Sequence, residues 1–344
     1  MNFTSDNVSG IAPEIMNALV ATNTGSAAAY GEDAITQRLN ARFSELFEGE
    51  ARVFPVVSGT AANALALATL SPPWGAIFCH EQAHILLDEA NAPEFYTGGA
   101  KLIPIAGDDG KITPERLERL LPGGLGSVHS AQPSVVSLTQ ANECGAVYSP
   151  SEIKAIADVA HKHGLLVHMD GARFANAVAF LGASPADVTW RIGVDVLSFG
   201  ATKNGALAAE AVVFFGPDKA QSLPSRRKRA GHLLSKMRFV SAQLEAYVTD
   251  GLWLRLAAQA NAMAARLAQG LTAAPGARLR HPVEINEIFV ELPEVIISGL
   301  LARGFEFYRW DGPQGRCIRL VTSWDTTEAS VDQFIETANL LAGP

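Results

Sequence analysis

Short apolar runs alternate with longer segments of helical spacing through the first 216 residues of the chain. Each run ends in polar or glycine-rich residues, and an amphipathic or alanine-rich stretch follows it. Examples are ARVFPVV, GAIFCH, PSVVSLT, LLVHMD and DVLSFG. Buried strands that alternate with helices are typical of a parallel sheet covered on both faces. We therefore expect an α/β fold with a mostly parallel central sheet and helices on both faces.

The pattern changes beyond Gly216. A basic run, SRRKRAGHLLSKMR, leads into a long helical pattern from about Leu233 to Gly270. Three strand-like segments follow, INEIFVELP, FEFYRW and CIRLVTSWDT, with helical segments between and after them. Strands flanked by helices predict a small α+β domain. We predict a large domain over residues 1–245 and a small C-terminal domain over residues 246–344.

Composition narrows the class of protein. Hydrophobic residues make up 48% and charged residues 18% of the 344 residues, which excludes a disordered chain. The formal charge of -8 argues against a nucleic-acid binder. The N-terminus lacks a basic and apolar leader, and no apolar stretch of about 18 residues occurs, so we expect a soluble, cytoplasmic protein without a membrane partner. Three separated cysteines without CxxC spacing indicate neither a disulfide framework nor a zinc site.

Two of the apolar runs end in residues with catalytic potential. LLVHMD ends in Asp170, and DVLSFGATKNG runs into Lys203. A helix and turns fit between them, so both residues can lie at the carboxyl edge of one parallel sheet, where α/β proteins bind ligands. A lysine can form a Schiff base with pyridoxal phosphate (PLP), and an aspartate can keep its pyridine nitrogen protonated. Each residue alone is more often an ordinary turn or loop charge, but the pair suggests a PLP site.

Another apolar run leads into a candidate anion site. ARVFPVV is followed by Ser58, Gly59 and Thr60 and then by an alanine-rich helix. Small residues let the backbone approach a phosphate, and the N–H groups of a first helical turn point outward. Such residues are also common in turns and helix caps, so this segment alone is a weak signal.

The segment HEQAH, residues 80–84, matches the zinc-binding pattern HExxH. That pattern requires both histidines on one long helix and a third ligand. Here a strand-like run leads directly into His80. We therefore expect no metal site.

Seven segments resemble, in order, motifs of the threonine aldolase family, whose members have the PLP-dependent fold of the aspartate aminotransferase type. They are TSDNVSG, YGEDAIT, SGTAANALAL, HILLDE, MDGARFANA, FGATKNGA and IRLVTSW. The likeness covers nearly the whole chain. HILLDE and LTQANECG depart from the more aromatic and glycine-rich versions of better-known members, which leaves the subgroup and the preferred side chain open.

The resemblance assigns cofactor roles to individual residues. Lys203 would hold PLP covalently, Asp170 would bind its pyridine nitrogen, and His84 would stack on its ring. A basic residue of the run 226–229 would contribute to the phosphate site, and we choose Arg229. The resulting set of cofactor-binding residues is Lys203, Ser58, Gly59, Thr60, His84, Asp170, Arg173 and Arg229.

The resemblance also implies an amino-acid substrate. Its carboxylate would be bound by Ser5, Arg173 and Arg319, because bidentate guanidinium groups fix the α-carbon relative to the ring. Residues 1–10 would thus contribute to the site of the large, PLP-binding domain.

The implied reaction is retro-aldol cleavage of L-threonine, L-allo-threonine or related β-hydroxy-α-amino acids, including β-phenylserine, to glycine and an aldehyde. A base must take the β-hydroxyl proton while the Cα–Cβ bond breaks, and the candidates are His84 and His129, directly or through water. A β-eliminating lyase and a transaminase use the same lysine and aspartate, so both remain alternatives. A PLP-fold protein without enzymatic activity is a further one.

For the assembly, the resemblance implies a homotetramer of two dimers with the active site at a dimer interface. Tyr30, in the loop AYGEDAIT, has no local role evident from the sequence, although a surface turn would explain the loop equally well. We predict that Tyr30 reaches the neighbouring subunit's pocket and contributes to substrate binding.

Overall fold

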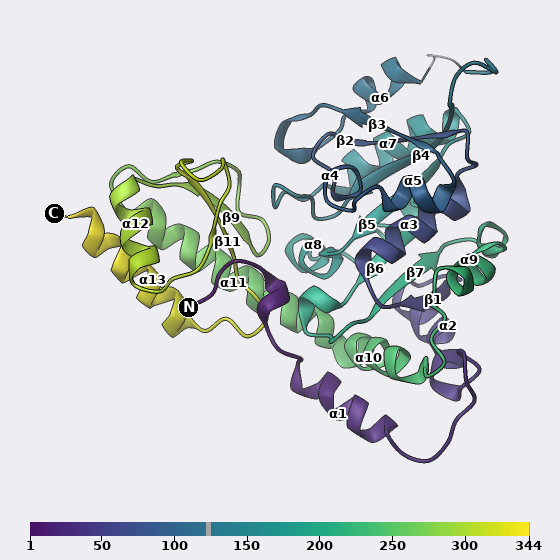
Figure 1. The fold of residues 1–344 in the computed structure, drawn as a ribbon, viewed down its shortest axis with the longest axis horizontal. Coiled ribbons are helices and arrows are strands. Elements are labelled where there is room, and N and C mark those ends of the chain that lie inside the picture. The colour runs from purple at the N-terminus through teal and green to yellow at the C-terminus, as the bar shows by residue number, and fades with distance from the viewer. Residues whose placement is uncertain (122–124, 344) are drawn as a thin grey trace.

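The computed structural model describes residues 1–121 and 125–343. Over these residues the larger sheet has seven strands in the order β1-β7-β6-β5-β4-β2-β3 (Figure 1). The strands are β1 (Arg52–Val56), β2 (Gly75–His80), β3 (Lys101–Ile105), β4 (Gln132–Thr139), β5 (Leu166–Gly171), β6 (Val196–Gly200) and β7 (Glu210–Phe214). Within this seven-stranded sheet, only the two described pairings that involve β7 are antiparallel. The prediction of a mostly parallel sheet is confirmed.

Helices cover both faces of this sheet (Figure 1). Alternate residues of β7 point to opposite faces, so Val213 joins one core and Val212 the other. The first face packs against α2 (Ala34–Leu46), α6 (Pro114–Leu120), α7 (Pro150–Lys162), α8 (Phe174–Leu181) and α10 (Arg238–Val248). The second packs against α3 (Gly59–Leu70), α4 (His84–Leu87), α5 (Ala92–Thr97) and α9 (Leu223–Arg229). α1 (Pro13–Thr22) lies against α10.

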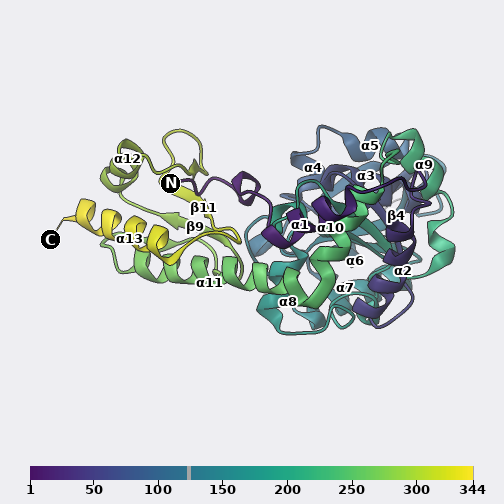
Figure 2. The same cartoon turned by 90° about the horizontal axis from the view of Figure 1, so that it is seen from below.

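A smaller antiparallel sheet lies beside the large one (Figure 2). Its strand order is β10-β11-β9-β8, formed by β8 (Arg278–Leu279), β9 (Glu287–Glu291), β10 (Tyr308–Arg309) and β11 (Cys317–Val321). It packs against α11 (Leu252–Thr272), α12 (Glu294–Ala302) and α13 (Glu328–Ala342). The N-terminus returns to this core, where the Phe3 ring lies 5.3 Å from that of Phe334. The predicted small α+β unit is therefore present.

Helix α11 connects the two cores. Trp253 and Ala257, near its start, pack in the large core, whereas Met263 and Leu267 pack in the small one. The start of α11 therefore belongs to the large core and its later part to the small core. The domain boundary at residue 245 stays a prediction. With 21 residues α11 is the longest helix described, and in residues 1–121 and 125–343 no helix is long and apolar enough to cross a membrane.

One predicted helix is two helices in the structure. The pattern from Leu233 to Gly270 predicted a continuous helix, but α10 ends at Val248 and α11 begins at Leu252. Between them Asp250 and Gly251 have left-handed backbone angles, with φ of 50° and 67°. A right-handed helix cannot continue through such residues, which corrects the prediction.

Candidate active site

The predicted lysine and aspartate lie at the carboxyl edge of the large sheet. Asp170 is the penultimate residue of β5, and Lys203 lies in the 3-10 turn Thr202–Asn204 that follows β6. The two strands are parallel neighbours, with Asp170 opposite Ser198. Adjacent strands therefore deliver both side chains to the same end of the sheet, where they line one cavity of about 300 Å³.

The start of α3 forms another wall of this cavity. Ser58, Gly59 and Thr60 line it, and Ser58 Oγ caps the helix by accepting a hydrogen bond from the Ala61 N–H at 3.3 Å. A Cβ added at Gly59 would meet no described atom within 4 Å, so the space beside this turn is open. N–H groups in a first helical turn lack partners within the helix and suit an anion.

A chain of hydrogen bonds connects Asp170 with His84. Asn63 Nδ2, on α3, donates to Asp170 Oδ2 at 2.7 Å and to Glu89 Oε1 at 2.9 Å. His84 Nδ1 lies 2.9 Å from the same oxygen of Glu89. This hydrogen bond raises the pKa of His84, and burial raises the pKa of Glu89. The chain holds the His84 ring at the cavity wall.

Asn63 and Glu89 were not among the predicted site residues. Both are buried, although one is an amide and the other a carboxylic acid. Asn63 is a single amide within an alanine-rich, buried helix, and buried polar residues require partners. This polar residue in SGTAANALAL was therefore a signal in the sequence that could have indicated the site.

Arg173 lines the cavity and has two carboxylate partners. Its Nε and Nη2 donate to Asp6 at 2.8 and 3.1 Å, and its Nη1 lies 3.2 Å from Glu287 Oε2. Burial raises the pKa of Asp6, but the charges of Arg173 and Lys203 and the hydrogen bonds from Arg173 and Asn286 together hold that pKa below its usual value. For Arg173 burial has the opposite effect and lowers the pKa, but the charges of Asp6 and Glu287 raise it above its usual value.

The other two predicted carboxylate ligands lie beside this cluster. Arg319 on β11 has its Nε 3.5 Å from Glu287 Oε1, and its guanidinium carbon lies 5.5 Å from the Trp310 ring centre. Ser5 caps the 3-10 turn Asp6–Val8 by accepting a hydrogen bond from the Asn7 N–H at 3.1 Å. Asn7 lines the cavity. The N-terminal segment therefore meets the site through Asp6 and Asn7.

Two further glutamates line the cavity, and neither was predicted from the sequence. Glu210, the first residue of β7, accepts a hydrogen bond from the Ala201 N–H at 3.0 Å. Glu143 lies in the loop that follows β4, within the segment LTQANECG. Burial raises the pKa of each to about 7.

His129 lies at the other edge of the sheet. It is exposed, precedes β4, and lines a separate cavity with Lys101, the first residue of β3. Parallel strands place their amino ends opposite their carboxyl ends, so the fold separates His129 from Lys203. The single chain therefore does not place His129 beside Lys203, and the role of His129 as a catalytic base stays a prediction.

The predicted phosphate arginine, Arg229, is exposed on α9, whereas Arg227 is buried. The Arg227 guanidinium lies 5.7 Å from the Phe54 ring centre, and its Nη1 donates to the Pro55 carbonyl at 3.2 Å. Burial lowers the pKa of Arg227 to about 10. Arg227 is thus the residue of the basic run that contacts the strand leading into the Ser58 turn.

Tyr30 lies on the surface of the single chain. Its side chain is exposed, and the Lys228 ammonium lies 4.3 Å from its ring centre. The cavity that contains Lys203 is lined by other residues of the described chain. A role for Tyr30 in catalysis therefore requires a second subunit.

The geometry does not match the HExxH interpretation. His80 ends β2 and its Nε2 lies 3.1 Å from the Gly107 carbonyl oxygen, whereas His84 begins α4. The two histidines do not share a helix. In the part of the chain that the structure describes, no group of three histidine, cysteine or acidic side chains could hold a metal ion.

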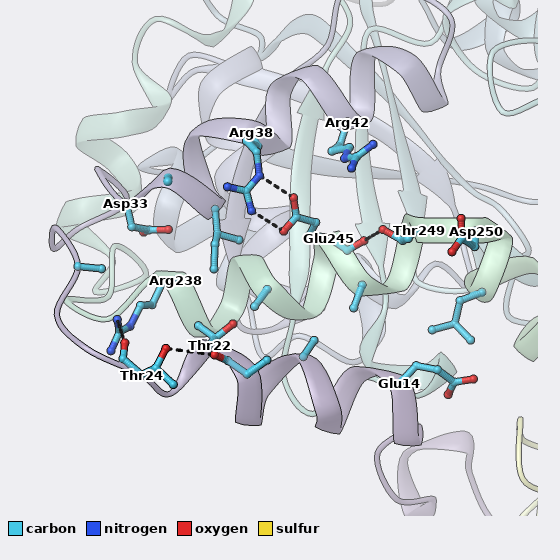
Figure 3. A pocket seen from close by; sticks show the side chains of 18 of the residues that line it. Glu14, Thr22, Thr24, Asp33, Arg38, Arg42, Arg238, Glu245, Thr249 and Asp250 are labelled. Atoms are coloured by element: carbon cyan, nitrogen blue, oxygen red, sulfur yellow. Dashed lines mark hydrogen bonds and ion pairs between the residues drawn. The ribbon is translucent and has the colours of Figure 1, made fainter.

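A larger cavity, of about 760 Å³, lies between α1, α2 and α10 (Figure 3). Two of its arginines have partners within the chain: Arg38 contacts Glu245 at 3.0 Å, and Arg238 donates to the Thr24 carbonyl. The predicted catalytic residues line the smaller cavity instead. The chemistry therefore identifies the smaller cavity as the candidate active site.

Comparisons with known proteins agree with this fold. The family model of β-eliminating lyases matches residues 2–294. The chain is 45% identical to a low specificity L-threonine aldolase of Pseudomonas aeruginosa, over 99% of this chain and 98% of that protein. A similar enzyme of a Pseudomonas species is also 45% identical, over 96% of this chain and 95% of that protein. A solved threonine aldolase structure from Leishmania major has a TM-score of 0.93 and 29% identity, over 99% of both chains.

The family model identifies the class of protein as a lyase, and its fold is of the α/β type. The chain belongs to the β-eliminating lyase family and, within it, to the threonine aldolases.

Proposed function

We propose that the protein uses PLP to cleave L-threonine, L-allo-threonine and related β-hydroxy-α-amino acids to glycine and an aldehyde. One observation carries this proposal: a single cavity combines Lys203, Asp170, the start of α3 and Arg173. These groups match the aldehyde, pyridine nitrogen and phosphate of the cofactor and the carboxylate of an amino acid. The Pseudomonas relatives named low specificity L-threonine aldolase support the same reaction.

The residues of the cavity fit the proposed cofactor. Lys203 would hold it covalently, Asp170 would bind its ring nitrogen, and the turn Ser58 to Thr60 would bind its phosphate. Asn63 Oδ1 and Glu89 Oε2 are buried without a hydrogen-bond partner in the described structure, as expected of polar groups that a ligand completes. When bound, PLP supplies the electron sink that allows the Cα–Cβ bond to break.

The remaining residues would bind and orient the substrate. Arg173 would hold the carboxylate, with Arg319 and Ser5 completing that end of the site. His84, fixed by Glu89, would cover the ring of the cofactor and take part in proton transfer.

We also propose that the protein acts in the cytoplasm as a homotetramer of two dimers. Tyr30 would reach the partner's pocket, and Arg229 would approach the phosphate site of either subunit. The exposure of both side chains in the single chain supports a role at a subunit interface.

Product analysis tests the proposed reaction. The purified protein with PLP is expected to release glycine and an aldehyde in equal amounts from L-threonine, L-allo-threonine or β-phenylserine. A β-eliminating lyase would instead release ammonia and a keto acid, and a transaminase would require an amino acceptor. Release of either of these product sets, with no glycine, would contradict the proposal.

A further inference from the structure

The carboxylate of Glu143 occupies a position that the proposed cofactor and carboxylate sites do not use. The residue is placed by the loop after β4, so it reaches the same edge of the sheet as Asp170. Its Oε1 accepts hydrogen bonds from the His84 backbone N–H at 2.7 Å and from Thr139 Oγ1 at 3.1 Å. Two donors on one oxygen fix the orientation of the carboxyl group.

The other oxygen, Glu143 Oε2, is buried and has no hydrogen-bond partner among the residues that the structure describes. A buried acceptor without a donor is unfavourable, so a ligand that binds in the cavity is expected to bring one. On the proposed function, the substrate has a carboxylate for Arg173 and an amino group that joins the cofactor. Its β-hydroxyl is the remaining donor, and the free oxygen of Glu143 suits it.

The surroundings of Glu143 also suit proton exchange near neutral pH. Burial and the charge of Asp170 raise its pKa to about 7, against the opposing hydrogen bonds from His84 and Thr139. The other charged or titratable groups that interact with it are Arg173, Cys79, Cys144 and Tyr148. His84 is the weaker candidate, because its hydrogen bond with Glu89 favours the protonated ring, and a protonated imidazole cannot accept a proton.

We propose that Glu143 is the catalytic base that takes the proton of the substrate β-hydroxyl, an inference that rests on the proposed function. The O–H bond breaks as its proton moves to Glu143 Oε2, and the electron pair of that bond forms the carbonyl group of the aldehyde. The Cα–Cβ bond breaks and its electron pair remains at Cα. Cα then takes up one proton, so glycine and the aldehyde contain every atom of the substrate.

Two reactions of the holoenzyme separate this role from a structural one. Cleavage of L-threonine involves a β-oxygen, whereas exchange of the Cα proton of glycine for deuterium does not. In Glu143→Gln, the cleavage rate constant is expected to fall roughly 100- to 10,000-fold. Exchange on glycine is expected to stay within about threefold, which also shows that the variant is folded and binds the cofactor. Equal loss of both reactions, as expected if Glu143 acted on the cofactor or only shaped the loop, would overturn the proposal, and so would unchanged cleavage.

Thr139→Val provides the matched variant, because it keeps the carboxyl group and removes one hydrogen bond. That bond lowers the pKa of Glu143, so its loss should move the acidic limb of the cleavage pH profile to higher pH. A limb that does not move would contradict the assignment. In the apoprotein, infrared titration should show two carboxyl groups that titrate near pH 7, those of Glu143 and Glu210, and Glu143→Gln should retain only one of them. A wild-type enzyme that neither cleaves L-threonine nor exchanges glycine would refute the proposed function instead.

Discussion

The charged residues around Arg173 form ion pairs with one another. Asp6 and Glu287 share Arg173, and Glu287 also contacts Arg319. Two buried carboxylates can lie beside two half-buried guanidinium groups because each charge has a partner. A substrate carboxylate would therefore bind Arg173 in competition with Asp6, and this competition links the N-terminal segment to substrate affinity.

Asp6→Asn tests this balance. The variant leaves Arg173 with one carboxylate fewer, and loss of one partner in a buried pair costs about 3 kcal/mol of the free energy of unfolding at pH 7. The folded state lowers the pKa of Asp6 below 3.8, so its stabilising effect is present at neutral pH and is lost as the pH falls through that lowered value. Urea denaturation at pH 7 and at acidic pH should show that the difference in the free energy of unfolding between Asp6→Asn and the wild type is smaller in acid.

The control is Asp187→Asn, which breaks an exposed pair with Arg191. Exposed pairs contribute little to stability, so this variant should unfold like the wild type. Equal stability of Asp6→Asn and Asp187→Asn at pH 7 would mean that the Asp6 contact is not stabilising.

At the scale of elements, strand ends and helix starts deliver the site. Asp170 and Lys203 could be predicted because each ends or follows an apolar, strand-like run. Parallel neighbouring strands bring such residues to the same edge of the sheet. Glu143 could not be placed in this way, because it lies in a loop whose path depends on contacts with His84 and Thr139. His129 comes before the strand-like run PSVVSLT, so its distance from the carboxyl edge of the sheet could have been predicted from the sequence.

The break between α10 and α11 gives a prediction about local structure. Gly251 has φ of 67°, and a Cβ there would meet no described atom within 4 Å. Gly251→Ala should therefore destabilise the protein through backbone strain alone, by about 1 kcal/mol. Gly10→Ala is the matched control, because its site is equally open and its φ is not left-handed. A thermal unfolding midpoint of Gly251→Ala equal to or higher than that of Gly10→Ala would contradict this explanation.

At the scale of the whole molecule, the large and small units share residues that are far apart in the sequence. Phe3 packs against Phe334, and Asn286 Nδ2 donates to Asp6 Oδ2 at 3.0 Å. The alternation of strands and helices predicted both units. The return of the N-terminus to the small core could not be predicted, because a short polar segment carries no periodic pattern.

The proposed homotetramer makes activity depend on the association of subunits. If Tyr30 contributes to substrate binding in the partner's pocket, activity should fall as the protein dissociates on dilution. Tyr30→Ala should then raise the KM for the substrate without changing the fold. Sedimentation equilibrium measured beside activity tests this. A fully active monomer would refute the shared site, whereas an active dimer would refute only the tetramer.

The proposed function requires that Lys203 carries a cofactor with which the protein cleaves β-hydroxy-α-amino acids. The most direct measurement is the amount of glycine and acetaldehyde formed from L-threonine by the wild type and by Lys203→Ala, both supplied with PLP and matched by thermal unfolding. The wild type should form the two products in equal amounts, and Lys203→Ala should lose at least about 1,000-fold in rate while remaining folded. Cleavage by Lys203→Ala at a rate near that of the wild type would contradict the account.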